Sequence, residues 1–212
     1  AEHAASALAR ADIVRALGPG FLVCHFDARA GHGADTMAHY RDLGEAVGAE
    51  LVLEAVIPCV DGSGAPTADL AVMRRDVDQV AAAARAGGAR FGRVAVSPAA
   101  DLKCTLPGSQ FPPAPPATEL YAAAREAFAG VPIGGGMFSY FTELNRKRPP
   151  AEALDFVCHT VCPLVHAGDD HSLLEGLEAL PSIVETTRSF AGGKPYWLFP
   201  SAISMRQNPY GA

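Results

Sequence analysis

This sequence of 212 residues lacks the features of a membrane, secreted or nucleic-acid-binding protein. No apolar run approaches the roughly 18 residues that a membrane-spanning helix needs. The formal net charge of −6 is spread along the chain, so no basic tract indicates a nucleic-acid partner. No signal peptide is recognisable, and a start at AEHAASALAR without Met is what a fragment of a longer protein would show.

Cysteine is scarce, and its odd count argues against a framework of disulfides. The five cysteines mostly lie inside apolar runs, where free buried thiols of a reducing compartment are the simplest interpretation. We therefore expect a cytoplasmic protein. These residues are Cys24, Cys59, Cys104, Cys158 and Cys162.

Strand-like and helix-like segments alternate along the chain. The strand-like segments are short apolar runs rich in β-branched and aromatic residues, and Ala-rich segments with helical spacing separate them. Several helical segments end on Gly, a common helix stop. The alternation predicts a parallel sheet with crossover helices. The six apolar runs are 21–28, 50–58, 91–98, 132–141, 155–165 and 195–203.

Two parallel architectures fit this alternation, a doubly wound sheet and a (β/α)8 TIM barrel. The doubly wound sheet usually has a G-x-G-x-x-G turn after its first strand, whereas the first run here ends HFDARAGHGAD. A barrel instead carries polar residues at the C-terminal ends of many strands. We predict an N-terminally truncated barrel of about six βα units, forming one partial domain over residues 1–212. The polar residues are His25, Asp27, Arg29, Ser97, Asp101, Glu143, Asn145, His159, His166, Ser201, Ser204 and Arg206.

The segment 134–150, GGGMFSYFTELNRKRPP, ends a glycine-rich strand on a carboxylate, an amide and three cations. The glycines would let neighbouring backbone or substrate come close. If the strand continues to Asn145, Glu143 and Asn145 share one side and face the barrel mouth, with the cations at 146–148 turned outward. Alternatively, Glu143 merely pairs with Arg146 or Lys147 on a solvated loop. Both interpretations remain open.

The segment 157–172, VCHTVCPLVHAGDDHS, holds three histidines and two aspartates. A metal site has to be considered, but neither H-x-H nor H-E-x-x-H spacing occurs. We favour Asp170 as the N-cap of the following helix, with His171 in its first turn outside the pocket. His166 then lies at the rim of the barrel, and Cys158 and Cys162 belong to the core.

The last polar segment, FPSAISMRQNPYG at 199–211, offers hydroxyl, guanidinium and amide donors. Arg206 could stabilise a carboxylate or a developing oxyanion. Equally, Arg206 could hold loop carbonyls, with Asn208 in an Asn-Pro turn.

Taken together, three motifs resemble the D-apionate lactonase family. They are F-x-E-L-N-R after the glycine-rich strand, P-x-V-H-A-x-D-x-x-S-L-x-E, and a final strand that leads to R-x-N-P. The resemblance runs from about residue 132 to the end and is only architectural before that. It implies the TIM-barrel domain of a larger protein, related to glycoside hydrolase barrels, with flanking domains outside this chain.

The resemblance implies opening of a sugar-acid lactone, D-apionolactone to D-apionate, by water. We expect no cofactor or metal. Such a reaction needs a base, oxyanion donors and an acid for the leaving hydroxyl. Its implied catalytic groups are Glu143 as base or acid, His166 and His159 as proton-transfer partners, and Arg206 as oxyanion donor. The groups expected to bind sugar hydroxyls are Tyr140, Asn145, Asn208, Asp170, His25 and Asp27.

A second catalytic carboxylate, which glycoside hydrolase barrels use, is not apparent in the sequence. Glu54 falls within its strand, and three further glutamates fall on a helical segment (Glu175, Glu178 and Glu185). A lactonase with one carboxylate is therefore favoured. A glycoside hydrolase with an unrecognised second carboxylate, or a sugar-binding barrel fragment without turnover, remains the alternative.

Overall fold

Six parallel strands form one sheet in which each strand pairs with the next strand along the chain. The computed structural model describes residues 3–105, 107–162 and 167–203. The predicted parallel strands and their sequential order are confirmed. The strands are β1 (Phe21–Asp27), β2 (Glu50–Ile57), β3 (Arg93–Pro98), β4 (Ile133–Met137), β5 (Phe156–Val161) and β6 (Tyr196–Ser201).

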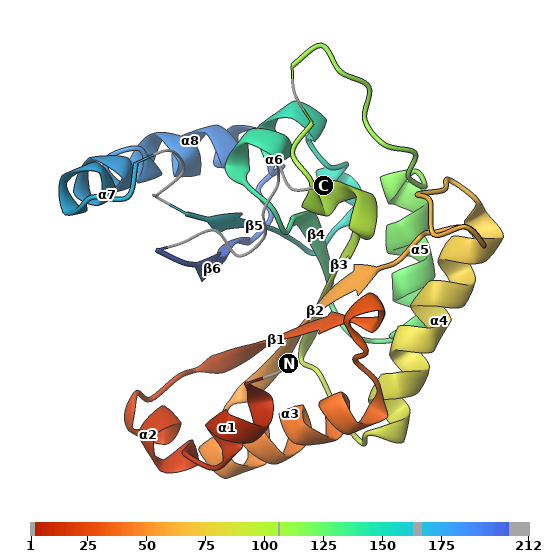
Figure 1. Cartoon of the computed structure of the whole chain (residues 1–212), viewed down its shortest axis with the longest axis vertical. Coiled ribbons are helices and arrows are strands. Elements are labelled where there is room, and N and C mark those ends of the chain that lie inside the picture. Colours follow the sequence, from red (N-terminus) through yellow and green to blue (C-terminus); the bar gives the residue numbers. More distant parts are fainter. Residues whose placement is uncertain (1–2, 106, 163–166, 204–212) are drawn as a thin grey trace.

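Helices follow the strands and lie along the outside of the curled sheet (Figure 1). Two short helices, α1 (Ala4–Leu8) and α2 (Ala11–Ala16), precede β1 and contact α3. The α-helices after β1 are α3 (Ala34–Val47), α4 (Leu70–Ala86), α5 (Ala117–Ala127), α6 (Phe141–Lys147), α7 (Asp170–Leu177) and α8 (Leu180–Phe190). Short 3-10 turns occupy Ala28–Ala30, Ala99–Leu102 and Ala151–Ala153.

The sheet separates two apolar cores, because alternate residues of each strand face opposite sides. One core lies between the sheet and the helices and includes Leu53 and Val94. The other fills the concave interior and includes Val56, Ala95 and Phe156. The adjacent residues Ala55 and Val56 of β2 thus belong to different cores, which is the arrangement of a barrel wall.

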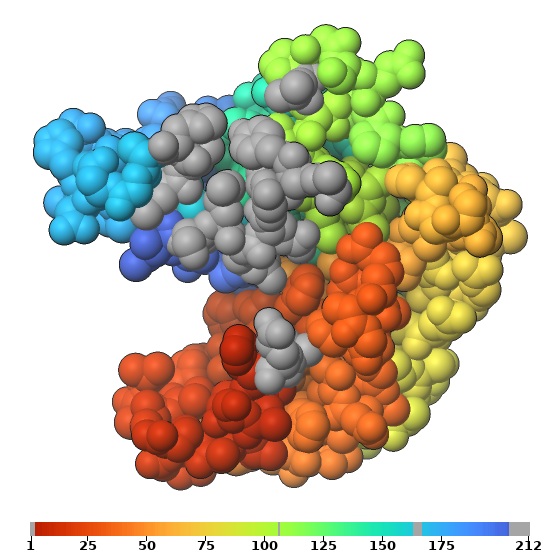
Figure 2. Space-filling model, in the orientation of Figure 1, coloured from red at the N-terminus to blue at the C-terminus, as the bar shows by residue number. Residues whose placement is uncertain are grey.

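The curl of the sheet brings its two outer strands together at their N-terminal ends. The rings of Phe21 in β1 and Trp197 in β6 have centroids 4.9 Å apart. The hydrogen-bonded pairing nevertheless runs only from β1 through to β6, so within the described residues the sheet is a half-barrel rather than a closed one. Figure 2 shows the corresponding notch between the first, red part of the chain and the last, blue part.

The three glycines of β4 each face a close neighbour, as the sequence predicted. A Cβ at Gly134 would lie 2.1 Å from the Phe156 ring, and one at Gly135 would lie 2.5 Å from the Tyr121 ring. Gly136 has a φ of +145°, and a Cβ there would lie 1.9 Å from the backbone oxygen of Cys158. Side chains are therefore excluded from these three positions, where β5 and α5 pack directly against the backbone of β4.

β4 ends at Met137 and α6 begins at Phe141, so the condition on which Glu143 and Asn145 would share one side, a strand that continues to Asn145, is not met. Helical spacing places Glu143 in the first turn and Arg146 and Lys147 in the last turn, which suits the helix dipole. Glu143 and Leu144 are both buried. Glu143 therefore belongs to a helix, and it does not share a strand face with Asn145.

His159 lies in β5 on the helix-facing side of the sheet, opposite the interior residue Cys158. Its side chain is fully buried, and its ring packs beside Phe141 and Tyr196. Nδ1 lies 2.8 Å from the Thr160 oxygen and Nε2 lies 2.6 Å from the Tyr196 hydroxyl. The Thr160 oxygen can only accept, so Nδ1 carries the hydrogen and Nε2 accepts from Tyr196.

No disulfide links the cysteines, all of which lie in the described part of the chain, and Cys24, Cys59 and Cys158 are buried as predicted. Burial raises the pKa of Cys24 and of Cys59 to about 12. These thiols therefore act as small apolar groups of the core.

Replacing Gly136 with Ala should destabilise the protein, because the new methyl group would collide with the β5 backbone at a φ that L-residues rarely adopt. We expect the free energy of unfolding to fall by about 1–3 kcal/mol, which is the typical cost of overpacking a core. Urea unfolding followed by circular dichroism measures this. Gly62→Ala is the matched control, since nothing lies within 4 Å of a Cβ there. Equal midpoints for the two variants would contradict the close approach of β4 and β5.

Stability should depend on pH through His159. Burial lowers the pKa of His159, and the hydrogen bond to Thr160 offsets only part of this effect. The folded state therefore binds this proton less readily than the unfolded state, whose pKa is about 6.5. The stabilising contribution is complete above that value and is lost as pH falls through the lower, folded pKa.

We expect the unfolding free energy of the wild type to fall between pH 7.5 and pH 5.5, by at most about 1.4 kcal/mol per pH unit from this one group. His159→Gln should flatten that dependence, whereas His171→Gln should not, because His171 is 81% exposed. A slope that stays the same in His159→Gln would show that other groups cause it. Urea unfolding at a series of pH values makes the comparison.

Candidate active site

The polar residues of β1, β2 and β3 meet on the concave face of the sheet, near the C-terminal ends of the strands. His25 and Asp27 alternate with Cys24 and Phe26, which face the helices. Glu54 is the register partner of His25, and it alternates with helix-facing neighbours in the same way. Nδ1 of His25 lies 2.6 Å from Oε1 of Glu54. His25 of β1 is thus paired with the carboxylate of Glu54 in the adjacent strand β2.

Burial distinguishes the two members of this pair. The side chain of Glu54 is 0% exposed, whereas that of His25 is 25% exposed. A carboxylate is buried in this way only when charged or hydrogen-bonding groups compensate for the water that it loses. Behind the ring, the Tyr40 hydroxyl of α3 donates to the His25 carbonyl at 2.6 Å and fixes this part of β1.

Asp27, the last residue of β1, is held by its own following turn. Its carboxylate accepts from the backbone nitrogen of Arg29 at 3.0 Å and from the Arg29 guanidinium at 3.0 and 2.6 Å. Its backbone nitrogen donates to Nδ1 of His32 at 2.9 Å. Burial alone would raise the pKa of Asp27, but the bonds and charge of Arg29 outweigh it and hold the pKa below its ordinary value. Asp27 is therefore a fixed anion beside His25.

Glu143 lies at the start of α6 with only 2% of its surface exposed. Its Oε1 accepts from the Arg146 guanidinium at 2.7 Å and from the Cys104 thiol at 3.0 Å. The same guanidinium also donates to the Thr105 carbonyl at 2.7 Å. Burial, with the Glu143 bond as the next contribution, raises the pKa of Cys104. The pairing of Glu143 with Arg146 that the sequence left open is present. Glu143 is buried and Arg146 is 36% exposed, and it is the bonds to Cys104 and Thr105 that join α6 to the segment after β3.

A second ion pair joins the same two segments. Lys147 of α6 binds Asp101 of the turn after β3, and its ammonium lies 4.6 Å from the centre of the Phe111 ring. Burial raises the pKa of Asp101, although Lys147 acts in the opposite direction. Beside this pair is a cavity of about 290 Å³, whose wall includes Tyr121 and Pro150. Lys147 thus turns inward, and only Arg146 and Arg148 of the predicted outward cations are exposed.

The remaining predicted hydroxyl contacts are spread over two places. Tyr140 is the half-buried residue before α6, and Asn145 accepts from Arg148 at 3.0 Å through its side chain. Asp170 is exposed in α7 and is not the N-cap. The prediction of its cap role is wrong, because the Asp169 side chain accepts from the Ser172 backbone nitrogen at 2.9 Å. In Figure 1, α7 projects away from the sheet, so the structure does not bring Asp170 to the other candidates.

Three predicted site residues, His166, Arg206 and Asn208, lie outside the described residues, as does Ser204. His159 is described but does not join Glu143, because it faces the helices with both ring nitrogens engaged. His171 lies in the first turn of α7, as predicted, and pairs with Glu175 at 3.4 Å. Over the described residues, no group of three His, Cys, Asp or Glu side chains could hold a metal ion.

Glu54 is the site residue that sequence reasoning missed. The available signal was a carboxylate in the middle of the apolar run ELVLEAVIP, at an interior position of the alternation. Two buried hydroxyls, those of Ser97 and Ser139, have no hydrogen-bond partner within the described part of the chain. Ser97 is paired in register with the interior residue Val56, so its hydroxyl belongs to the same concave face.

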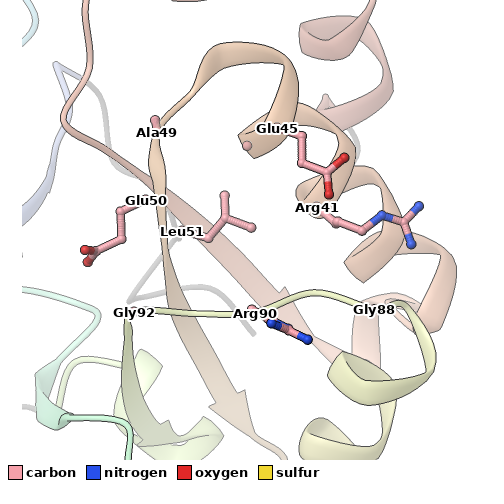
Figure 3. A pocket seen from close by; sticks show the side chains of 9 residues that line it. Arg41, Glu45, Ala49, Glu50, Leu51, Gly88, Arg90 and Gly92 are labelled. Atoms are coloured by element: carbon pink, nitrogen blue, oxygen red, sulfur yellow. The ribbon is translucent and has the colours of Figure 1, made fainter.

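A larger hollow of about 530 Å³ lies at the other end of the sheet (Figure 3). Its wall carries Arg41 and Glu45 from α3, Glu50 at the start of β2, and Arg90 in the loop before β3. Figure 3 shows Glu50 pointing away from the two arginines. Parallel barrels place their catalytic groups at the opposite, C-terminal ends of the strands. The hollow is therefore separate from the candidate site.

None of the described helices combines the length and apolarity that crossing a membrane requires.

Solved structures with a similar fold include glycan-degrading enzymes. One belongs to a study of two fungal β-1,4-galactanases, with a TM-score of 0.51, 11% identity, and coverage of 81% of this chain and 61% of that one. Another is the catalytic domain of the GH26 endo-β-1,4-mannanase of Bacillus sp. JAMB-750, with a TM-score of 0.52 and 14% identity. It covers 88% of this chain and 58% of that one. At these identities the likeness establishes the TIM-barrel-like fold alone.

Sequence comparison is more specific. The chain is 42% identical over 211 residues to the D-apionate lactonase of Brucella anthropi. The aligned region covers 100% of this chain and 33% of that protein. The chain thus spans about a third of the length of this curated relative. The family model for the TIM-barrel domain of D-apionate lactonase matches residues 1–212, which extends the resemblance to the part before residue 132. The chain belongs to the D-apionate lactonase TIM-barrel domain family.

Proposed function

We propose that this chain is the catalytic barrel of a hydrolase that opens a sugar-acid lactone, of the D-apionolactone to D-apionate type, with water. The observation that carries the proposal is the family match over the whole chain, together with a relative named D-apionate lactonase at 42% identity. The polar residues on the C-terminal side of the sheet support it, because this is where TIM barrels perform chemistry.

Lactone hydrolysis requires a base for water, donors for the carbonyl oxygen, and an acid for the departing ring oxygen. In our proposal, Glu143 takes the proton from the attacking water. Its place after β4 supports this role, and its Oε1 accepts one hydrogen bond besides the ion pair, from the Cys104 thiol at 3.0 Å. Arg146 would hold the carboxylate in position while water replaces the thiol.

The other predicted contacts complete the proposed site. Arg206 remains the proposed oxyanion donor and His166 a proposed proton-transfer group. Asp27, Tyr140, Asn145 and Asn208 remain proposed partners of sugar hydroxyls. Asp27 has the best support, because its position at the end of β1 and its bond to Arg29 fix an acceptor beside the interior.

An assay panel with the protein of full natural length separates this proposal from its alternatives. Opening of D-apionolactone releases a proton, which a pH indicator detects. A glycoside hydrolase would instead release reducing ends from an oligosaccharide, and a sugar-binding module would do neither. Proton release with D-apionolactone but no reducing ends from galactan or mannan supports the proposal, and the reverse result overturns it.

Glu143→Gln should keep the fold and much of the substrate binding but lower turnover by at least about a hundredfold, because proton-transfer groups typically contribute about 10²–10⁴ in rate. Proton release under saturating D-apionolactone measures the loss. Arg148→Ala is the control on the same helix end, and it should cost far less, since an exposed rim charge contributes little.

The ion pair with Arg146 offers a structural explanation of Glu143 that the same variants can expose. If Glu143→Gln retains near-full turnover and instead unfolds more easily, the carboxylate serves only to join α6 to the segment after β3. Thermal unfolding of Glu143→Gln and Arg146→Gln makes that comparison.

A further inference from the structure

We propose that His25 is the general acid of this site and that Glu54 is its positioning carboxylate. The inference rests on the proposed lactone-opening function and deepens it, because it names the group that protonates the departing ring oxygen. The sequence assigned His25 only to hydroxyl binding and set Glu54 aside as part of its strand.

The placement of His25 and Glu54 supports the acid role of His25. His25 and Glu54 are register partners in adjacent strands, and both face the concave interior rather than the helices. Backbone hydrogen bonding between β1 and β2 therefore fixes both residues, and Tyr40 fixes the His25 carbonyl from behind. Groups on strands hold a reacting geometry better than groups on loops.

His25 and His159 differ in burial and in hydrogen bonding, and the difference supports the acid role of His25. His159 is fully buried and both of its ring nitrogens are engaged, as expected for a histidine that only packs. His25 uses only Nδ1, toward Glu54, and its side chain remains 25% exposed. Within the described part of the chain, Nε2 of His25 has no hydrogen-bond partner. One nitrogen is thus held, and the other can reach a ligand.

The charge of the neighbouring Glu54 carboxylate supports its role in positioning His25. A Glu that is 0% exposed inside an apolar strand costs stability unless a partner compensates for its lost hydration. The imidazole at 2.6 Å is such a partner, and because an ionised carboxylate can only accept, we assign the hydrogen to Nδ1. The carboxylate in turn balances the positive charge that the ring carries when protonated, and it sets which nitrogen faces the interior.

In the proposed reaction, this pair acts on the same lactone as Glu143. Glu143 removes a proton from water as the water oxygen forms a bond to the lactone carbonyl carbon. The bond between that carbon and the ring oxygen then breaks, and the ring oxygen takes the Nε2 proton of protonated His25 to become the hydroxyl of the product. His25 recovers its proton from Glu143 through solvent, so both groups return to their starting states.

The test exploits leaving-group basicity, which a merely structural histidine would not sense. D-apionolactone expels an alkoxide that needs a proton, whereas 4-nitrophenyl acetate expels a nitrophenolate that does not. In the protein of full natural length, we expect His25→Gln to lower turnover of the lactone by at least about a hundredfold. The loss with 4-nitrophenyl acetate should be much smaller.

Two further measurements keep the result interpretable. Added imidazole should restore part of the lactone turnover of His25→Ala, because it can enter the space of the missing ring and deliver the proton. Glu54→Gln, which preserves the shape of the buried side chain, should lower kcat much more than it changes KM. Circular dichroism and thermal unfolding confirm that each variant is folded.

The matched control is the exposed pair of His171 and Glu175 in α7, where the side chains are 81% and 63% exposed and the atoms are 3.4 Å apart. His171→Gln and Glu175→Gln remove the same chemical groups away from the concave face, and both should leave turnover unchanged.

The possible failures differ from one another. Full lactone turnover by His25→Gln, with an active wild type, overturns the role of His25 but leaves the lactonase proposal standing. Equal losses on both substrates without imidazole rescue also overturn it, because they show a structural effect. If 4-nitrophenyl acetate is not a substrate, imidazole rescue decides alone. A wild type that opens no lactone overturns the proposed function, and this inference with it.

Discussion

The curvature of the sheet depends on how closely β5 can approach the backbone of β4. Three consecutive residues without side chains let Phe156, Tyr121 and the Cys158 carbonyl occupy space that any Cβ would take. Phe156 can then turn into the concave interior, where it packs with Phe199 and Trp197. These rings fill the N-terminal part of the interior, and the polar residues are left at the other end. The glycines of β4 therefore allow the close packing of β5 and α5 against this part of the barrel wall.

In the described part of the chain, four acidic groups near the strand ends and in α6 each have a basic partner. Glu54 has His25, Asp27 has Arg29, Glu143 has Arg146, and Asp101 has Lys147. The first pair joins β1 to β2, the second joins the end of β1 to its following turn, the third lies within α6, and the fourth joins α6 to the segment after β3. Since removal of one partner from a buried pair costs more than the pair contributes, each pair also fixes a loop or strand end. The proposed chemistry thus uses groups that the fold already needs.

The strand order could be read from the sequence because each unit contains its own strong signals. Apolar runs, Ala-rich helices and glycine stops recur at short separations, and parallel strands joined by helices have few ways to pair. The end of β4 was different. The run MFSYF suits a strand as well as a helix start, and only the packing of Leu144 and Glu143 selects the helix. The His25–Glu54 pair required the register between two strands, which no single stretch of sequence contains. Similarly, the cap of α7 falls on Asp169 rather than on Asp170, because adjacent aspartates have the same local preference.

The sequential strand order has a consequence for how the chain reaches its folded state. Each strand pairs with the strand that precedes it, so the sheet can grow by adding one unit at a time, and each addition closes a loop of moderate length. The contact between Phe21 and Trp197 joins the first unit to the last, and it can form only after all the intermediate units are in place. The chain therefore loses the entropy of closing this long loop late in folding, when the growing sheet has already brought the two rings close together.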